Sequence, residues 1–187
     1  DVYKRQEKYN FDGKLISREL DGSINSSTYG ATIKRSKKLA NALTKLGVNI
    51  HDRVATIAWN NSRHFETYFA VSGMGAILHT LNPRYSPDQL IYILNHAEDT
   101  VLIIDATFIP LVESVQDRLD TVETIIVTSS LDTIPENNLK NVLSYEELIK
   151  DESDQYDWPE LDEDDAASLC YTSGTTGNPK GVLYSHR

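Results

Sequence analysis

Cysteine is nearly absent from this sequence: Cys170 is the only one among 187 residues, so no disulfide can form within the chain. Apolar runs long enough to span a membrane are also missing, and no signal-peptide pattern is present. An excess of positive charge is lacking too, because the formal net charge is −10 at pH 7. We therefore expect a cytoplasmic protein without a transmembrane segment. Neither nucleic acid nor an anionic membrane surface is expected as its main partner.

The rest of the composition is that of an ordinary globular protein, with 40% hydrophobic and 25% charged residues. A chain of this length can bury a core of its own. Residues 1–6 are the exception, because they resemble the translated end of a transposon used to prepare sequencing libraries. We expect them to be non-native, and a native charged segment is the alternative.

Glycines and hydroxyl groups are concentrated in residues 171–181, together with one lysine. Glycine leaves backbone amides uncovered, and successive amides form a concavity that binds anions. The hydroxyls add short donors, and the lysine adds a mobile positive charge. We therefore predict a loop that binds a polyphosphate between two short strands. Its expected binding residues are Thr172, Ser173, Gly174, Thr175, Thr176, Gly177 and Lys180.

This loop differs from the phosphate-binding Walker A motif, which places Gly-Lys-Ser/Thr at the start of a helix. Here Pro179 precedes Lys180 and Gly181 follows it, and the next residues have the pattern of a strand. A surface turn rich in serine, threonine and glycine, without a function, is the alternative. So many defined positions in one short run favour the functional interpretation.

Apolar runs alternate with helical periods over residues 28–128. Strands are expected at 53–59, 76–81, 101–105 and 124–128, and helices at 28–46, 63–74, 86–97 and 107–119. The clearest local signal is the capping box that Ser86 forms with Gln89, with Pro87 at the first helical position. The alternation predicts an α/β fold: a parallel sheet with right-handed crossovers and helices on both faces.

Three further segments have weaker patterns. Residues 15–20 predict an edge strand that turns at Asp21-Gly22, and residues 144–150 predict a short helix. Acidic residues accumulate over about 150–165, which predicts a solvated linker at a subdomain boundary.

The histidines at positions 51, 64, 79 and 96 lack metal-ligand spacing, so we expect packing or surface roles for them and no metal ligands.

The run from Ser173 to Gly181 resembles the signature of the adenylate-forming superfamily, which includes acyl-CoA synthetases, aryl-CoA ligases, luciferases and peptide-synthetase adenylation domains. Residues 53–60, 68–76, 79–84, 95–99 and 170–187 resemble its medium- and long-chain fatty acyl-CoA ligase branch. The resemblance implies that residues 7–187 are the incomplete N-terminal part of the family's large domain. The family's adenine, ribose and magnesium residues, and its small C-terminal domain, belong to segments further along.

The same resemblance implies a two-step reaction. A fatty acid attacks the α-phosphate of ATP with Mg²⁺ present, giving acyl-adenylate and pyrophosphate, and the thiol of coenzyme A then displaces AMP. The loop would hold the departing phosphates, with Lys180 as the catalytic residue, and His186 would lie near the acyl-adenylate. A homodimer is a further expectation. An enzyme for aryl or amino acids, and a non-catalytic nucleotide-binding module, remain alternatives.

Overall fold

The computed structural model describes residues 11–19, 21–172 and 177–187. The strands are β1 (Lys14–Arg18), β2 (Ile24–Thr28), β3 (Arg53–Ile57), β4 (Ile77–Thr80), β5 (Val101–Ile104), β6 (Thr124–Val127), β7 (Val142–Ser144), β8 (Ala166–Thr172) and β9 (Lys180–Ser185). The α-helices are α2 (Tyr29–Lys45), α3 (Ser62–Gly73), α4 (Pro87–Ala97), α5 (Ile109–Glu113) and α6 (Tyr145–Lys150). The predicted non-native residues 1–6 lie outside the described part.

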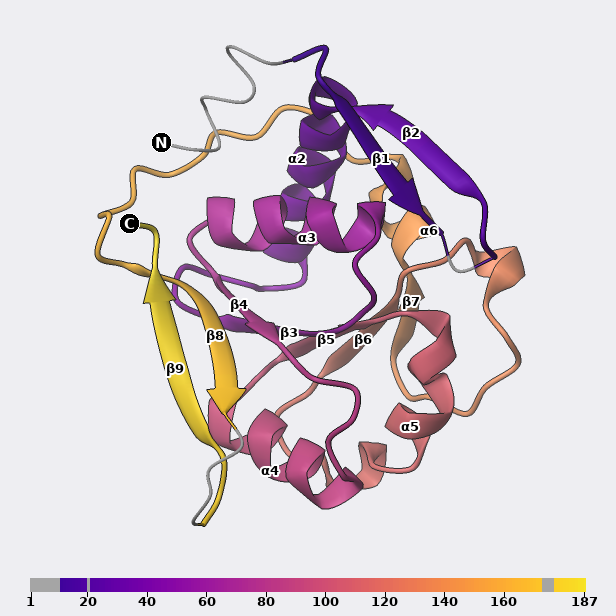
Figure 1. The fold of residues 1–187 in the computed structure, drawn as a ribbon, viewed down its shortest axis with the longest axis vertical. Helices are drawn as coiled ribbons and strands as arrows, with labels where there is room; N and C mark the ends of the chain where they lie inside the picture. Colours follow the sequence, from indigo (N-terminus) through magenta and orange to yellow (C-terminus); the bar gives the residue numbers. More distant parts are fainter. Residues whose placement is uncertain (1–10, 20, 173–176) are drawn as a thin grey trace.

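Seven of these strands form one sheet in the order β7-β6-β5-β3-β4-β8-β9, while β1 and β2 form a separate hairpin (Figure 1). Every neighbouring pair in the large sheet is parallel except β8 and β9. The chain crosses from β3 to β4 in one direction and then returns past β3 to β5. Right-handed crossovers in opposite directions place α3 and α4 on opposite faces, which confirms the predicted fold class.

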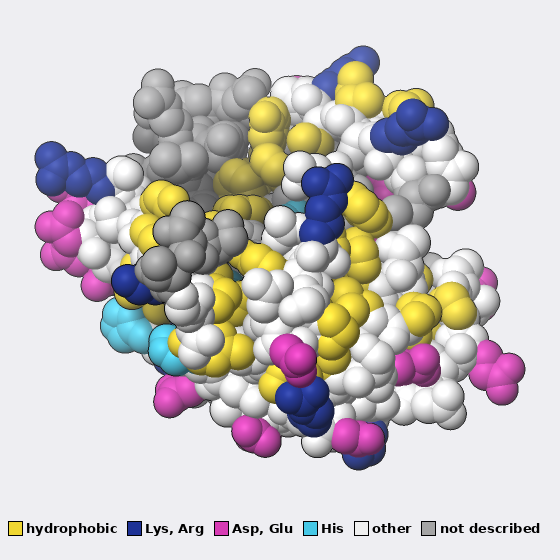
Figure 2. Space-filling view, turned by 60° about the horizontal axis from the view of Figure 1, so that its bottom comes forward, with side chains coloured by type: hydrophobic (Ala, Val, Ile, Leu, Met, Phe, Trp, Pro, Cys, Tyr) yellow, Lys and Arg dark blue, Asp and Glu magenta, His cyan; other side chains and the backbone are white. Residues whose placement is uncertain are grey.

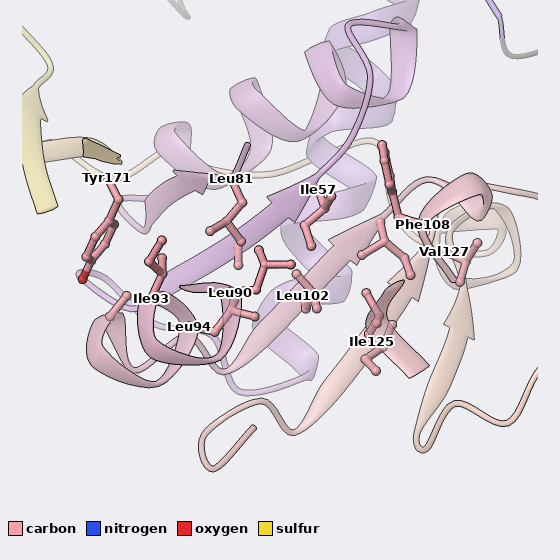
Figure 3. Packing of buried hydrophobic residues seen from close by; sticks show 14 of the residues in the cluster. Ile57, Leu81, Leu90, Ile93, Leu94, Leu102, Phe108, Ile125, Val127 and Tyr171 are labelled. Carbon is pink, nitrogen blue, oxygen red and sulfur yellow. The ribbon is translucent and has the colours of Figure 1, made fainter. Parts of the chain in front are cut away.

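Each face of the sheet therefore has its own apolar core. Helices α2, α3 and α6 cover one face, where Leu39, Leu43 and Tyr145 are fully buried. Helices α4 and α5 cover the other, where side chains of α4 interdigitate with those of β3 and β5 (Figure 3). Strand β5 is buried along its whole length, as expected for a strand covered on both sides.

Local signals placed the helix starts correctly. Ser86 caps α4 through the predicted capping box with Gln89, and Ser144 caps α6 by accepting from the amide of Glu147. Asn61 caps α3 by accepting from the amide of His64. The hairpin turn around Gly22 is confirmed as well, since Gly22 has a φ of +85° and its amide donates to the Glu19 carbonyl.

The single helix predicted over residues 107–119 is wrong. The segment forms a 3₁₀ turn at Ala106–Phe108, the short α5, and a second 3₁₀ turn at Gln116–Arg118. Pro110 restricts the helix start to the residue before it. The returning segment at residues 138–140 contacts the end of this helix: the Asn138 amide donates to the Glu113 carboxylate, and the side chain of Gln116 donates to the Asn138 carbonyl and accepts from the Lys140 amide. That segment leads into β7, a strand that we did not predict.

The acidic segment 151–165 has no regular structure, and its carboxylates are mostly exposed. It is nevertheless attached to the helices beneath it. Asn41 donates to the carbonyls of Ser153 and Gln155, both at 2.9 Å. The Trp158 ring packs so closely on α3 that a Cβ at Gly73 would lie 2.9 Å from it. That the segment marks a subdomain boundary stays a prediction.

Candidate functional site at the carboxyl edge of the sheet

The predicted strand–loop–strand turn is the antiparallel hairpin of β8 and β9. Thr172 and Lys180 stand opposite each other in its last described pair, and both are exposed. Gly177 has a φ of +85°, a backbone conformation that favours glycine. Residues 173–176, which include the predicted binding residues Ser173, Gly174, Thr175 and Thr176, lie outside the described residues.

The position of this hairpin follows from the parallel pairing. Strand β8 runs parallel to β4, so Thr172 lies at the edge where the carboxyl ends of the parallel strands meet. The connection after β4 returns to β5, whereas the connection after β8 continues outward to β9. Ligands of open α/β sheets bind outside the carboxyl ends of strands where the connections diverge in this way.

Glycine is required at the start of β9 as well. A Cβ at Gly181 would lie 3.1 Å from Leu169 and 3.3 Å from Tyr171, closer than side chains normally approach. Because Gly181 has no side chain, β9 can pair with β8 beside the side chains of Leu169 and Tyr171. This pairing places Lys180 opposite Thr172. The third glycine of the motif therefore has a packing role.

Tyr171 connects the hairpin to the core. Its side chain points from β8 toward α4 and joins the apolar cluster there (Figure 3). The hydroxyl of Tyr171 lies 2.6 Å from Nδ1 of His96 on α4. The hydroxyl of Tyr85 donates to the Tyr171 carbonyl at 2.8 Å. Burial, assisted by the negative charge of Asp99, raises the pKa of Tyr171 to about 12, so its hydroxyl stays protonated at neutral pH.

A buried histidine lies beside Tyr171. The rings of His79 and Tyr171 are 5.2 Å apart, and His79 Nδ1 lies 2.7 Å from Asp99 Oδ2. Both side chains of the His79–Asp99 pair are fully buried. Burial raises the pKa of Asp99 even though His79 opposes the shift. His79 is therefore a packing residue, as the sequence predicted.

A second polar group lies at the carboxyl ends of β3, β5 and β6. The buried carboxylate of Asp105 accepts hydrogen bonds from the Trp59 amide, the Asn61 side chain and the Thr128 hydroxyl. We did not predict this group from the sequence. Asp105 and Thr128 each follow a buried strand directly, and that position was the available signal.

His186 does not lie with Lys180. The two residues flank β9 at opposite ends, and its residues from 180 to 185 span roughly 17 Å in a strand. The amide of His186 donates to the carbonyl of Asp165 at the start of β8. Burial lowers the pKa of the His186 side chain. Among the described residues, Thr172, Gly177 and Lys180 therefore lie at the hairpin end, and His186 lies apart from them.

Other classes of site gain no support in the described ranges. Outside residues 1–10, 20 and 173–176, no three histidine, cysteine, aspartate or glutamate side chains gather as a metal site. No helix in the same ranges is both long and apolar enough to cross a bilayer. On the face drawn in Figure 2, lysine and arginine side chains are scattered among acidic, apolar and other side chains, without the extended basic surface typical of nucleic-acid binding.

Comparison with known proteins decides the family. The sequence model of the family described as AMP-binding enzyme matches residues 5–187 of this chain. The chain belongs to the AMP-binding enzyme family. Its relatives include a 3-methylmercaptopropionyl-CoA ligase of Ruegeria pomeroyi, 46% identical over 180 residues, and a medium-chain-fatty-acid–CoA ligase of Ectopseudomonas oleovorans, 45% identical over 180 residues. Each match covers 96% of this chain and 33% of the relative, so the chain spans about a third of their length.

Solved structures of such ligases share the fold of this AMP-binding family member. The crystal structure of an anthranilate CoA ligase in complex with anthranoyl-AMP superposes with a TM-score of 0.86 at 26% identity. That match covers 100% of this chain and 34% of the ligase. The N-terminal domain of a Mycobacterium tuberculosis protein, solved with an inhibitor, has a TM-score of 0.83 at 23% identity and supports the fold alone. The predicted resemblance to adenylate-forming enzymes is thereby confirmed.

Proposed function

We propose that the whole protein activates a carboxylic acid with ATP and transfers the acyl group to coenzyme A. The observation that carries the proposal is the hairpin end: Thr172 and Lys180 face each other at the carboxyl edge of the sheet, in a chain of the AMP-binding family. A hydroxyl donor and an ammonium group side by side are suited to phosphate oxygens.

In the proposed reaction, a carboxylate oxygen attacks the α-phosphorus of ATP and the bond to the bridging oxygen breaks. Pyrophosphate leaves with that electron pair. Thr172, Gly177 and Lys180, with the loop residues 173–176, would hold the phosphates as charge moves onto them. The thiol of coenzyme A would then attack the acyl carbonyl and release AMP. The first step needs no proton from Lys180 or Thr172, because an ionised carboxylate attacks and pyrophosphate leaves as an anion, so their proposed contribution is electrostatic.

Mg²⁺ and the remaining contacts to the nucleotide are a finer part of this proposal. In nucleotide sites Mg²⁺ is bound largely by the substrate phosphates and one or two carboxylates. The described residues contain no cluster of three acidic or other metal-binding side chains, so we assign no Mg²⁺ ligand to them. The ion would reach the hairpin together with ATP.

The proposed acid is a medium- or long-chain fatty acid. Support comes from the medium-chain ligase of Ectopseudomonas oleovorans and from a long-chain-fatty-acid–CoA ligase of Thermus thermophilus, each 45% identical to this chain. The Ruegeria pomeroyi relative is named for a short thioether acid, 3-methylmercaptopropionate, at a similar identity of 46%. That acid therefore belongs among the substrates to be tested.

The test is acid-dependent ATP–pyrophosphate exchange by the whole protein. The panel contains fatty acids of increasing length, 3-methylmercaptopropionate, an aryl acid and amino acids. We expect exchange with medium- or long-chain fatty acids and acyl-CoA formation when coenzyme A is added. Residues 1–187 alone serve as the inactive control, because they span only a third of the relatives' length. If only amino acids support exchange, the protein activates amino acids and the proposed fatty-acid substrate is wrong. If no acid supports exchange, a non-catalytic nucleotide-binding module is favoured.

Three finer predictions belong to the same proposal. A cytoplasmic location can be checked by cell fractionation, and a homodimer by light scattering of the whole protein. A role for His186 near the acyl-adenylate rests on the resemblance, and the structure places this residue at the end of β9 away from Lys180. The contribution of His186 must therefore be measured separately from that of the hairpin end.

A further inference from the structure

Strand β8 loses its parallel neighbour just before the site. The described pairing of β4 with β8 ends at Thr80 and Cys170, whereas β8 continues through Tyr171 to Thr172. On that side of β8, the next contact to the backbone is the hydrogen bond from the Tyr85 hydroxyl to the Tyr171 carbonyl, 2.8 Å long. Tyr85 thus continues the support that β4 gives to β8, one residue closer to the site.

The turn that carries Tyr85 is itself well anchored. The amide of Tyr85 donates to the carbonyl of Asn82, and the following residue, Ser86, is the N-cap of α4. The Tyr85 side chain is half-buried against the same apolar cluster that contains Tyr171. Its hydroxyl is therefore held in place by a capped helix on one side and by the core on the other.

Tyr171 is also held by a second contact, from His96 on α4. The hydroxyl of Tyr171 lies 2.6 Å from His96 Nδ1, and the two rings meet edge to face with centroids 5.9 Å apart. Tyr171 is thus held by its carbonyl and by its side chain, in both cases from α4 or the turn before it. The residue that follows Tyr171 is Thr172, which stands opposite Lys180.

We propose that Tyr85 is a positioning residue for the phosphate site, acting through the Tyr171 carbonyl on Thr172 and Lys180. The inference rests on the proposed function, and it adds a residue that neither the loop motif nor its spacing indicates. Small displacements of binding groups have large effects on rate, because the reacting atoms must be held within a narrow range of geometries. Without the Tyr85 hydroxyl, the end of β8 is held by its pairing with β9 and by His96.

The experiment uses Tyr85→Phe in the whole protein, which removes one hydroxyl and keeps the ring. We expect single-turnover formation of acyl-adenylate to slow by roughly two- to ten-fold, the loss typical of one hydrogen bond. Thiol attack on preformed acyl-adenylate should keep its rate, since pyrophosphate has already left. Tyr156→Phe is the matched control, because Tyr156 is half-buried over the opposite face of the sheet and should leave both steps unchanged.

A second readout does not depend on catalysis. Binding of inorganic pyrophosphate with Mg²⁺, measured by calorimetry, should weaken by roughly two- to ten-fold in Tyr85→Phe and stay constant in Tyr156→Phe. His96→Ala, which removes the other contact to Tyr171, should weaken it in the same direction. Both readouts are compared at equal folded fraction, checked by thermal melting.

The outcomes separate this inference from the proposed function. If wild-type protein exchanges no acid but Tyr85→Phe still weakens pyrophosphate binding, the proposed reaction fails and the role of Tyr85 stands. If adenylation and pyrophosphate binding are unchanged in Tyr85→Phe, the inference is overturned. It is also overturned if both half-reactions fall equally, because a general loss of folded structure would affect them alike.

Discussion

Replacing Lys180 by alanine is expected to slow acyl-adenylate formation by the whole protein. In the hairpin end, Lys180 is the residue with a full positive charge, and the amides and hydroxyls around it contribute hydrogen bonds only. Adenylation moves negative charge onto the departing pyrophosphate, so a cation placed there stabilises the transition state more than the ground state.

The expected magnitude follows from the position of the side chain. Removing one well-placed electrostatic donor from an active site typically costs on the order of 10²–10³ in rate, or about 3–4 kcal/mol. Lys180 is exposed in this structure, and Mg²⁺ would neutralise part of the same charge. We therefore expect a loss of at least roughly ten-fold, below that range. Lys180→Arg should restore only part of the rate, because a planar guanidinium replaces a compact ammonium.

The assay follows the two half-reactions separately under single-turnover conditions. Adenylation should slow in Lys180→Ala, whereas thiol attack on preformed acyl-adenylate should be nearly unaffected. Lys140→Ala is the control, since Lys140 is an exposed lysine paired with Asp117 on another segment. Unchanged adenylation in a folded Lys180→Ala protein, or an equal fall of both steps, would refute the assigned role.

Three further variants test other parts of the structure. Arg35→Met leaves the buried Glu66 carboxylate without its charged partner at 2.8 Å, with the Tyr145 hydroxyl still donating to it, and should destabilise the protein by about 3 kcal/mol, the lower end for buried pairs. Burial already raises the pKa of Glu66, and losing Arg35 raises it further. As pH falls through the raised pKa, Glu66 of the variant becomes neutral, so the stability difference between Arg35→Met and wild type, measured by urea unfolding, should shrink. Gly73→Ala pushes a methyl group into the Trp158 ring and should lower the free energy of unfolding by about 1 kcal/mol. The loss would appear as a lower urea midpoint, and an unchanged midpoint would contradict that packing. His186→Ala should slow adenylation independently of Lys180→Ala, and the two effects should add within about 0.5 kcal/mol in a double mutant, because the residues lie at opposite ends of β9.

Patterns that depend on neighbouring residues were readable from the sequence. The caps of α3, α4 and α6 each involve residues three apart, and the capping box of α4 was predicted from Ser86, Pro87 and Gln89. The alternation of apolar strands and amphipathic helices was sufficient for the fold class, since right-handed crossovers leave few topologies. The composition of residues 171–181 was sufficient to predict a turn between two strands, whereas the antiparallel pairing of those strands was not predicted.

Features that depend on distant contacts were not readable. In the segment expected as one helix over 107–119, Glu113 and Gln116 bind residues 138–140 through their side chains, and no local signal announces that contact. Tyr85 and Tyr171 are 86 residues apart in the chain and meet only because β4 and β8 become neighbours. The strand order that makes them neighbours depends on which connections return across the sheet, and the apolar pattern does not contain that information.

The carboxylate of Asp105 has a consequence for the rigidity of the carboxyl edge of the sheet. By accepting from the loop after β3, the helix start of α3 and the end of β6, it joins three segments of the carboxyl edge into one unit. Segments that are already ordered lose little conformational entropy when a ligand arrives, so more of the contact energy is retained as affinity. Because the carboxylate is buried, loosening any one of the three would leave a polar group partly unsatisfied in the interior. If a ligand binds at this edge as proposed, differences in what it accepts would arise from the side chains that these three segments carry, because the segments themselves are held in place.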